Sequence, residues 1–122
     1  MAKPGRKGIT RLIYAIGYSA KGMRSAWVHE AAFRQELILV LVLFPLAFWL
    51  GDAPEDVMLL IGSGILVLIV ELLNSAVEAV VDQVTEEYAE LAGRAKDMGS
   101  AAVMLSLCLM VLTWVTIGMD WV

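Results

Sequence analysis

Five polar residues lie on one side of an otherwise apolar stretch of the chain. They stand at offsets of 0, 3, 4, 7 and 11 residues: Glu71, Asn74, Ser75, Glu78 and Asp82. At about 100° per residue, these offsets place all five side chains on one face of an α-helix. An ionised carboxylate inside a bilayer costs at least a few kcal/mol, so a glutamate there marks a functional site by default. The pattern indicates acid–base or metal chemistry.

The two glutamates of this face predict different roles. Glu78 lies two helical turns beyond Glu71, about 10 Å along the axis, so it is closer to water and can bind a cation while ionised. Glu71 lies in drier surroundings and is suited to act as a general base. Glu30, just before the first apolar run, is the natural second cation ligand, and two carboxylates suit Mg²⁺ with a nucleotide. The alternative is a buried hydrogen bond or ion pair that holds helices together.

The composition points to a membrane. Hydrophobic residues make up 60% of the 122 residues, against about 45–50% in soluble proteins. A chain this short keeps a large share of its surface exposed, so the surplus apolar side chains must face lipid. The net charge of −4 argues against a nucleic-acid partner. The single cysteine, Cys108, cannot form an internal disulfide and reads as a small hydrophobic residue.

Three apolar stretches approach the length of about 20 residues that crosses a bilayer. We expect spans at about 33–51, 57–81 and 98–119, with a short turn between the first two and a charged loop over 82–97 before the third. Ahead of them, apolar residues recur at near-helical spacing among basic ones, which predicts an amphipathic surface helix over about 8–28. The expected fold is a single all-α integral membrane domain, residues 1–122.

The basic residues predict the orientation. All nine lie before or at the very start of the first span, or between the second and third spans. The positive-inside rule places both segments in the cytoplasm, so the short turn and the C-terminus lie outside. The acidic face therefore runs out through the cytoplasmic side of the membrane.

Three stretches of the chain resemble the prokaryotic diacylglycerol kinase family of small membrane kinases. The stretch 71–82 reads Glu-x-x-Asn-Ser-Ala-x-Glu-x-x-x-Asp, the stretch 93–102 reads Gly-Arg-Ala-Lys-Asp-Met-Gly-Ser-Ala-Ala, and 24–36 is also similar. The resemblance covers the chain from about Thr10 to Trp114. It implies an ATP-dependent kinase of the bacterial inner membrane, built as a homotrimer. Such a kinase transfers the γ-phosphoryl of MgATP to diacylglycerol, giving phosphatidic acid and ADP.

The resemblance also implies roles for individual residues. Glu71 looks like the general base for the lipid hydroxyl, supported by Asn74, and Glu30 and Glu78 look like the Mg²⁺ ligands. Nucleotide contacts are implied for Arg11, Tyr18, Glu30, Glu78, Glu87, Tyr88, Lys96 and Asp97. Contacts with the lipid substrate are implied for Arg11, Ser19, Arg24, Trp27, Arg34, Trp49, Glu71, Ser100 and Trp114.

Other functions are compatible with the same residues. An undecaprenol kinase of the sister family shares the Glu-x-x-Asn-Ser/Thr-x-x-Glu core and phosphorylates a polyprenyl alcohol. A proton-coupled transporter subunit or a non-catalytic scaffold would also place acidic residues in a bundle, but a transporter needs them near mid-membrane or beyond. His29 stands where the family commonly has Asn, and Ala20 stands where it commonly has an aromatic residue. These two differences bear on the affinity for substrates and not on the class of protein. Acyl-chain preference and the number of metal ions stay open, as does the sharing of sites between protomers.

Overall fold

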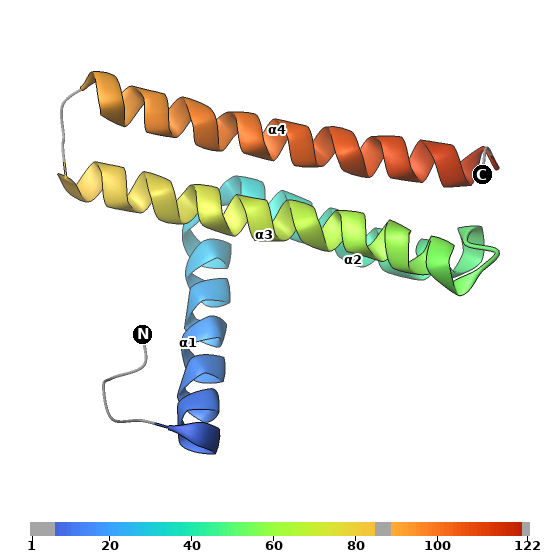
Figure 1. Ribbon diagram of the computed structural model, residues 1–122, viewed down its shortest axis with the longest axis horizontal. Coiled ribbons are helices and arrows are strands. Elements are labelled where there is room, and N and C mark those ends of the chain that lie inside the picture. The colour runs from blue at the N-terminus through green and yellow to red at the C-terminus, as the bar shows by residue number, and fades with distance from the viewer. Residues whose placement is uncertain (1–6, 85–88, 121–122) are drawn as a thin grey trace.

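The computed structural model describes residues 7–84 and 89–120, and they form four helices. The helices are α1 (Gly8–His29), α2 (Ala31–Leu50), α3 (Pro54–Val84) and α4 (Glu90–Gly118). Helices α2, α3 and α4 run alongside one another as a bundle, and α1 projects away from it (Figure 1). The all-α fold expected from the sequence is confirmed.

Helices α2, α3 and α4 are each long and apolar enough to cross a membrane, as the sequence predicts. With 31 residues, α3 is about 46 Å long at ~1.5 Å per residue, whereas hydrocarbon is about 30 Å thick. Its polar C-terminal turns therefore extend beyond the apolar layer. Figure 1 shows these turns and the start of α4 reaching past the point where α1 meets α2.

Helix α4 begins at Glu90, well inside the stretch expected to be a loop over 82–97. Lys96 and Asp97 are consequently helical residues, and Lys96 contacts Asp82 of α3. The expected loop was too long because hydropathy marks only the part of a helix that lies in hydrocarbon. Backbone hydrogen bonds continue the helix through charged residues on either side.

Few side chains are buried inside the bundle, and most large apolar side chains are exposed on its outside. The largest fully buried side chains are Phe33, Leu60 and Val67. One buried cluster joins α1, α2 and α3 through Ala26, Phe33 and Leu68. A second cluster lies toward the other end of the bundle and consists of Ala47, Leu60 and Ile117. In a membrane the exposed apolar side chains lie against lipid or other protein.

Candidate active site

Glu30 lies at the corner where α1 ends and α2 begins. Its backbone is extended, with φ −117° and ψ 105°. The Arg34 guanidinium donates to the carbonyl oxygens of Trp27 at 2.7 Å and Val28 at 3.2 Å. These carbonyl oxygens belong to the last turn of α1, where no N–H group of the same helix follows to donate to them. Arg34 thereby stabilises the corner between α1 and α2, and this corner places Glu30 beside the bundle.

Glu71 is the buried centre of a group of carboxyl groups. Its side chain is only 5% exposed. Glu30 and Glu78 both act on it electrostatically, and its side chain is hydrogen-bonded to that of Glu36 on α2. The side chains of Glu36 and Glu71 therefore lie against each other across α2 and α3. The structure therefore brings together the three carboxylates expected from the sequence, and adds a fourth.

Glu36 was missed in the sequence analysis. It stands at the start of the first apolar run and is half-buried in α2. Its position immediately before that run was a usable signal, because a carboxyl group at the edge of a span needs a partner. What the sequence lacks is the partner itself, because Glu36 and Glu71 are far apart along the chain.

Asn74 is hydrogen-bonded to the carboxyl group nearer the membrane boundary. Its Nδ2 donates to Glu78 Oε1 at 3.3 Å, one helical turn further along α3. Its Oδ1 is buried and finds no hydrogen-bond partner among the described residues. Asn74 thus contacts Glu78 with one end of its amide, and its supporting role in the site stays a prediction.

Lys96 brings positive charge to the acidic face. Its Nζ lies 2.7 Å from Asp82 Oδ1, in an ion pair between α4 and α3. Both side chains are exposed, so water and salt screen this pair. Lys96 can therefore exchange Asp82 for another anion, such as a phosphate group.

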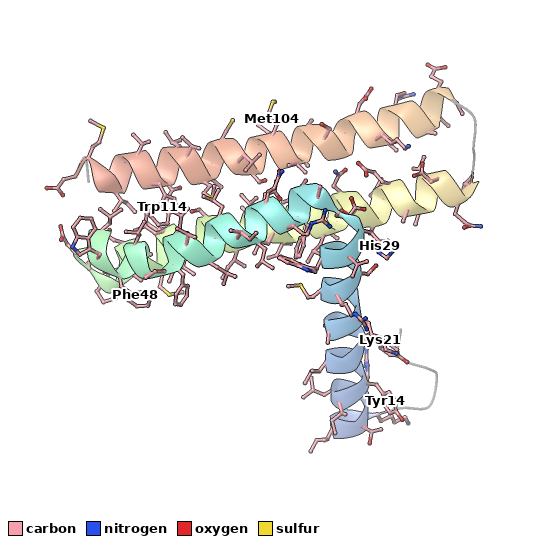
Figure 2. The ribbon with its side chains drawn as sticks, turned by 180° about the vertical axis from the view of Figure 1, so that it is seen from behind. Tyr14, Lys21, His29, Phe48, Met104 and Trp114 are labelled. Carbon is pink, nitrogen blue, oxygen red and sulfur yellow. The ribbon has the colours of Figure 1, made fainter. Side chains whose placement is uncertain are left out.

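A groove of about 650 Å³ lies between α1 and α3. Its walls include Ser19, His29 and Glu30 on one side and Leu72 and Ser75 on the other. Pockets for small ligands generally measure about 300–1,000 Å³. Figure 2 shows His29 at the corner where α1 joins the bundle, and Lys21 and Tyr14 further out along α1. The groove thus opens next to the carboxylates.

Comparison with known proteins identifies the family of this chain. The model of the prokaryotic diacylglycerol kinase family matches residues 17–118. The chain belongs to the prokaryotic diacylglycerol kinase family. The diacylglycerol kinase of Escherichia coli K12 is 57% identical over 107 residues, which cover 88% of each chain. The family and the kinase class predicted from the sequence are confirmed.

Relatives from other bacteria match over similar lengths. The diacylglycerol kinase of Haemophilus influenzae is 49% identical over 107 residues, covering 88% of this chain and 91% of its own. That of Pseudomonas aeruginosa is 48% identical over 113 residues, covering 93% and 92%. The similarity therefore extends over nearly the full length of both chains and includes all four helices.

Apart from the glutamates already described, the residues predicted to contact the substrates fall into four groups. Ser19, Arg24, Trp27, Arg34, Lys96, Asp97 and Ser100 lie on the parts of α1, α2 and α4 nearest the carboxylates, and Arg11 and Tyr18 lie further out on α1. Trp49 and Trp114 lie toward the far end of the bundle; Figure 2 shows Trp114 there. Glu87 and Tyr88 lie outside the described residues.

The metal expected for a diacylglycerol kinase can be compared with these side chains. Within residues 7–84 and 89–120, no group of three or more His, Cys, Asp or Glu side chains is arranged to hold a metal ion. Mg²⁺ does not need such a group, because it commonly uses one or two protein carboxylates together with waters and substrate phosphates. Glu30 and Glu78 fit that smaller donor set.

Proposed function

We propose that this protein phosphorylates diacylglycerol, transferring the γ-phosphoryl of ATP to the lipid hydroxyl to give phosphatidic acid and ADP. The observation that supports this most directly is the convergence of Glu30, Glu71 and Glu78 from two different parts of the chain. The names of the relatives support diacylglycerol as the acceptor. Phosphoryl transfer asks mainly for positioning and charge stabilisation, which a few charged residues can supply.

Glu71 acts as the general base in this reaction. It is buried in the bundle beside Glu36 and near Glu30 and Glu78, and the lipid hydroxyl reaches it from the bilayer. As the hydroxyl oxygen bonds to the γ-phosphorus, its proton passes to the Glu71 carboxylate, and the bond from that phosphorus to the ADP oxygen breaks. Burial also keeps water, a competing acceptor of the phosphoryl group, away from the reacting atoms.

Glu30 and Glu78 hold Mg²⁺ together with the nucleotide phosphates. When bound, Mg²⁺ neutralises part of the charge on the transferring phosphoryl group. Asn74 orients Glu78 through the Nδ2 to Oε1 hydrogen bond. Arg34 orients Glu30 indirectly, because it stabilises the end of α1 from which Glu30 projects.

The nucleotide occupies the groove between α1 and α3. Lys96 leaves Asp82 to bind a phosphate oxygen, and Arg11, Tyr18, Asp97, Glu87 and Tyr88 complete the contacts. The lipid contacts Ser19, Arg24, Trp27, Arg34 and Ser100 near the headgroup, with Trp49 and Trp114 toward its other end. Because Ser19 also lines the groove, the proposal places the lipid headgroup next to the nucleotide.

The membrane setting follows from the distribution of charge. The protein spans the bacterial inner membrane three times as one domain, with its N-terminus in the cytoplasm and its C-terminus outside. Helix α1 lies on the cytoplasmic surface, with exposed Ile9, Leu12, Ile13 and Ile16 as its apolar contacts. Three copies assemble, and assembly covers part of the apolar surface that the single bundle leaves exposed.

A phosphate-transfer assay tests the proposal. Purified protein in mixed micelles receives γ-labelled MgATP and either a diacylglycerol or undecaprenol. Label in phosphatidic acid supports the proposed reaction. Label only in undecaprenyl phosphate moves the chain to a polyprenol substrate, and label in neither lipid removes the kinase mechanism. A Glu71→Gln variant serves as the control for contaminating kinases.

A further inference from the structure

Gly99 on α4 lies directly opposite the Asn74 side chain of α3. A Cβ built on Gly99 overlaps Asn74 Oδ1 and lies 3.2 Å from Asn74 Cγ. The amide therefore occupies the space that any other residue at position 99 would fill. Helix α4 can approach α3 at this level only because Gly99 has no side chain.

The hydrogen bonds of Asn74 alone do not hold its amide in place. Among the described residues Oδ1 has no partner, and the bond from Nδ2 to Glu78 Oε1 is long at 3.3 Å. The reversed amide would turn its carbonyl oxygen toward the Glu78 carboxylate, and two acceptors repel. The missing side chain of Gly99 leaves the space that the amide oxygen occupies in the orientation that donates to Glu78.

Three other helical glycines, Gly62, Gly64 and Gly118, meet different surroundings. A Cβ at Gly62 or Gly118 would meet no described atom within 4 Å apart from its own helix and chain neighbours. At Gly64 the nearest atom is Val40 Cγ2 at 3.2 Å, which belongs to an apolar side chain and not to a polar group. Among Gly62, Gly64, Gly99 and Gly118, Gly99 is therefore the glycine whose contact is a polar group of the candidate active site.

We propose that Gly99 is a positioning residue of the kinase: it seats the Asn74 amide so that Asn74 holds Glu78 in place for the metal–nucleotide complex. This inference rests on the proposed function, in which Glu78 is a Mg²⁺ ligand. A methyl group at position 99 displaces Asn74, and Glu78 then loses the hydrogen bond that orients its carboxylate.

The test uses the full-length protein in micelles with Gly99→Ala, Asn74→Ala and the double variant. Binding of Mn²⁺ in the presence of ADP is followed by electron paramagnetic resonance, and the Mg²⁺ concentration for half-maximal rate is measured beside it. Loss of a residue that orients a metal ligand typically weakens affinity about 10–100-fold, which is the loss expected for Gly99→Ala. The KM for diacylglycerol should stay close to that of the wild type.

The double variant shows whether Gly99 acts through Asn74. If it does, Gly99→Ala adds nothing once Asn74 is already Ala, so the double variant and Asn74→Ala bind Mn²⁺ equally. Losses that multiply would overturn the proposal, as would wild-type Mn²⁺ binding in Gly99→Ala. The methyl group of Gly99→Ala overlaps Asn74 and can prevent the single variant from folding. In that case the comparison of Asn74→Ala with the double variant still tests the proposal, because neither of these variants contains the overlap.

Gly64→Ala is the matched control for packing. It places the same methyl group between α2 and α3 against the Val40 side chain, so it should leave the Mn²⁺ affinity unchanged. A loss in Gly64→Ala equal to that in Gly99→Ala would show that helix packing in general controls the site, and would also overturn the proposal. Failure of the wild type to phosphorylate diacylglycerol is a separate outcome and concerns the proposed function.

Discussion

The two ends of the bundle are held together by different means. At the end that carries Trp114, α3 and α4 meet through apolar packing around Leu60 and Ile117, and Trp114 Nε1 donates to the Leu60 carbonyl oxygen at 3.2 Å. At the other end, acidic groups and an amide converge around Glu71. Within the described residues, the buried side-chain oxygens without a partner, Glu36 Oε2 and Asn74 Oδ1, both belong to this acidic end.

This difference indicates that the acidic end of the bundle serves the reaction and the apolar end serves stability. Buried polar atoms without partners reduce stability, and proteins keep them where a ligand or a reaction uses them. The apolar end has no such atoms among the described residues. Its packing offsets the loss of stability at the acidic end. Substitutions should therefore change activity at one end and stability at the other, and the following variants test that separation.

The largest effect is expected from Glu71→Gln. The amide keeps the shape and most of the polarity of the side chain but cannot take a proton from the lipid hydroxyl. Turnover should fall about 10²–10⁴-fold, the usual contribution of a general base, while ADP–Mn²⁺ binding changes little. Glu55→Gln, in the exposed first turn of α3, is the control. Turnover near the wild-type level would remove Glu71 as the base.

Leu60→Ala probes the apolar end. Leu60 is fully buried, so truncation should lower the free energy of unfolding in micelles by about 2–5 kcal/mol. The KM for MgATP of the folded protein should be unchanged. Leu59→Ala, whose side chain is exposed, should cost much less. A large change in MgATP affinity in Leu60→Ala would show that the two ends are coupled.

Glu78→Gln returns to the acidic end with a smaller expected effect than Glu71→Gln. A neutral amide is a weaker Mg²⁺ ligand than a carboxylate, so metal–nucleotide affinity should fall about 10–100-fold. Turnover at saturating Mg²⁺ should recover more than it does in Glu71→Gln. Equal losses of turnover in both variants at saturating Mg²⁺ would contradict the separate roles of the two glutamates. Glu90→Gln, exposed at the start of α4, controls for the loss of charge.

Trp114→Phe should have the smallest effect. It keeps an aromatic ring but removes the N–H that donates to Leu60, so unfolding should become easier by about 0.5–1.5 kcal/mol. Thermal unfolding in micelles measures this loss. A parallel rise in the KM for diacylglycerol would support the lipid contact expected at this residue, whereas unchanged kinetics would leave Trp114 with a structural role.

The sequence by itself determined the features that depend on neighbours along the chain. Hydropathy over some 20 residues predicted three apolar helices, and the helical period placed Glu71, Asn74 and Glu78 on one face, because both signals are local. The motifs also identified the family. The length of the charged loop was overestimated, because the backbone hydrogen bonds of α4 continue where hydropathy ends.

Only the tertiary structure decided which groups meet across helices. Glu36 lies against Glu71, and Gly99 lies against Asn74, although each pair is separated by more than twenty residues along the chain. Such contacts depend on how far and at what rotation two helices approach each other. The sequence of either helix alone does not contain that information, because packing is settled by the side chains of both.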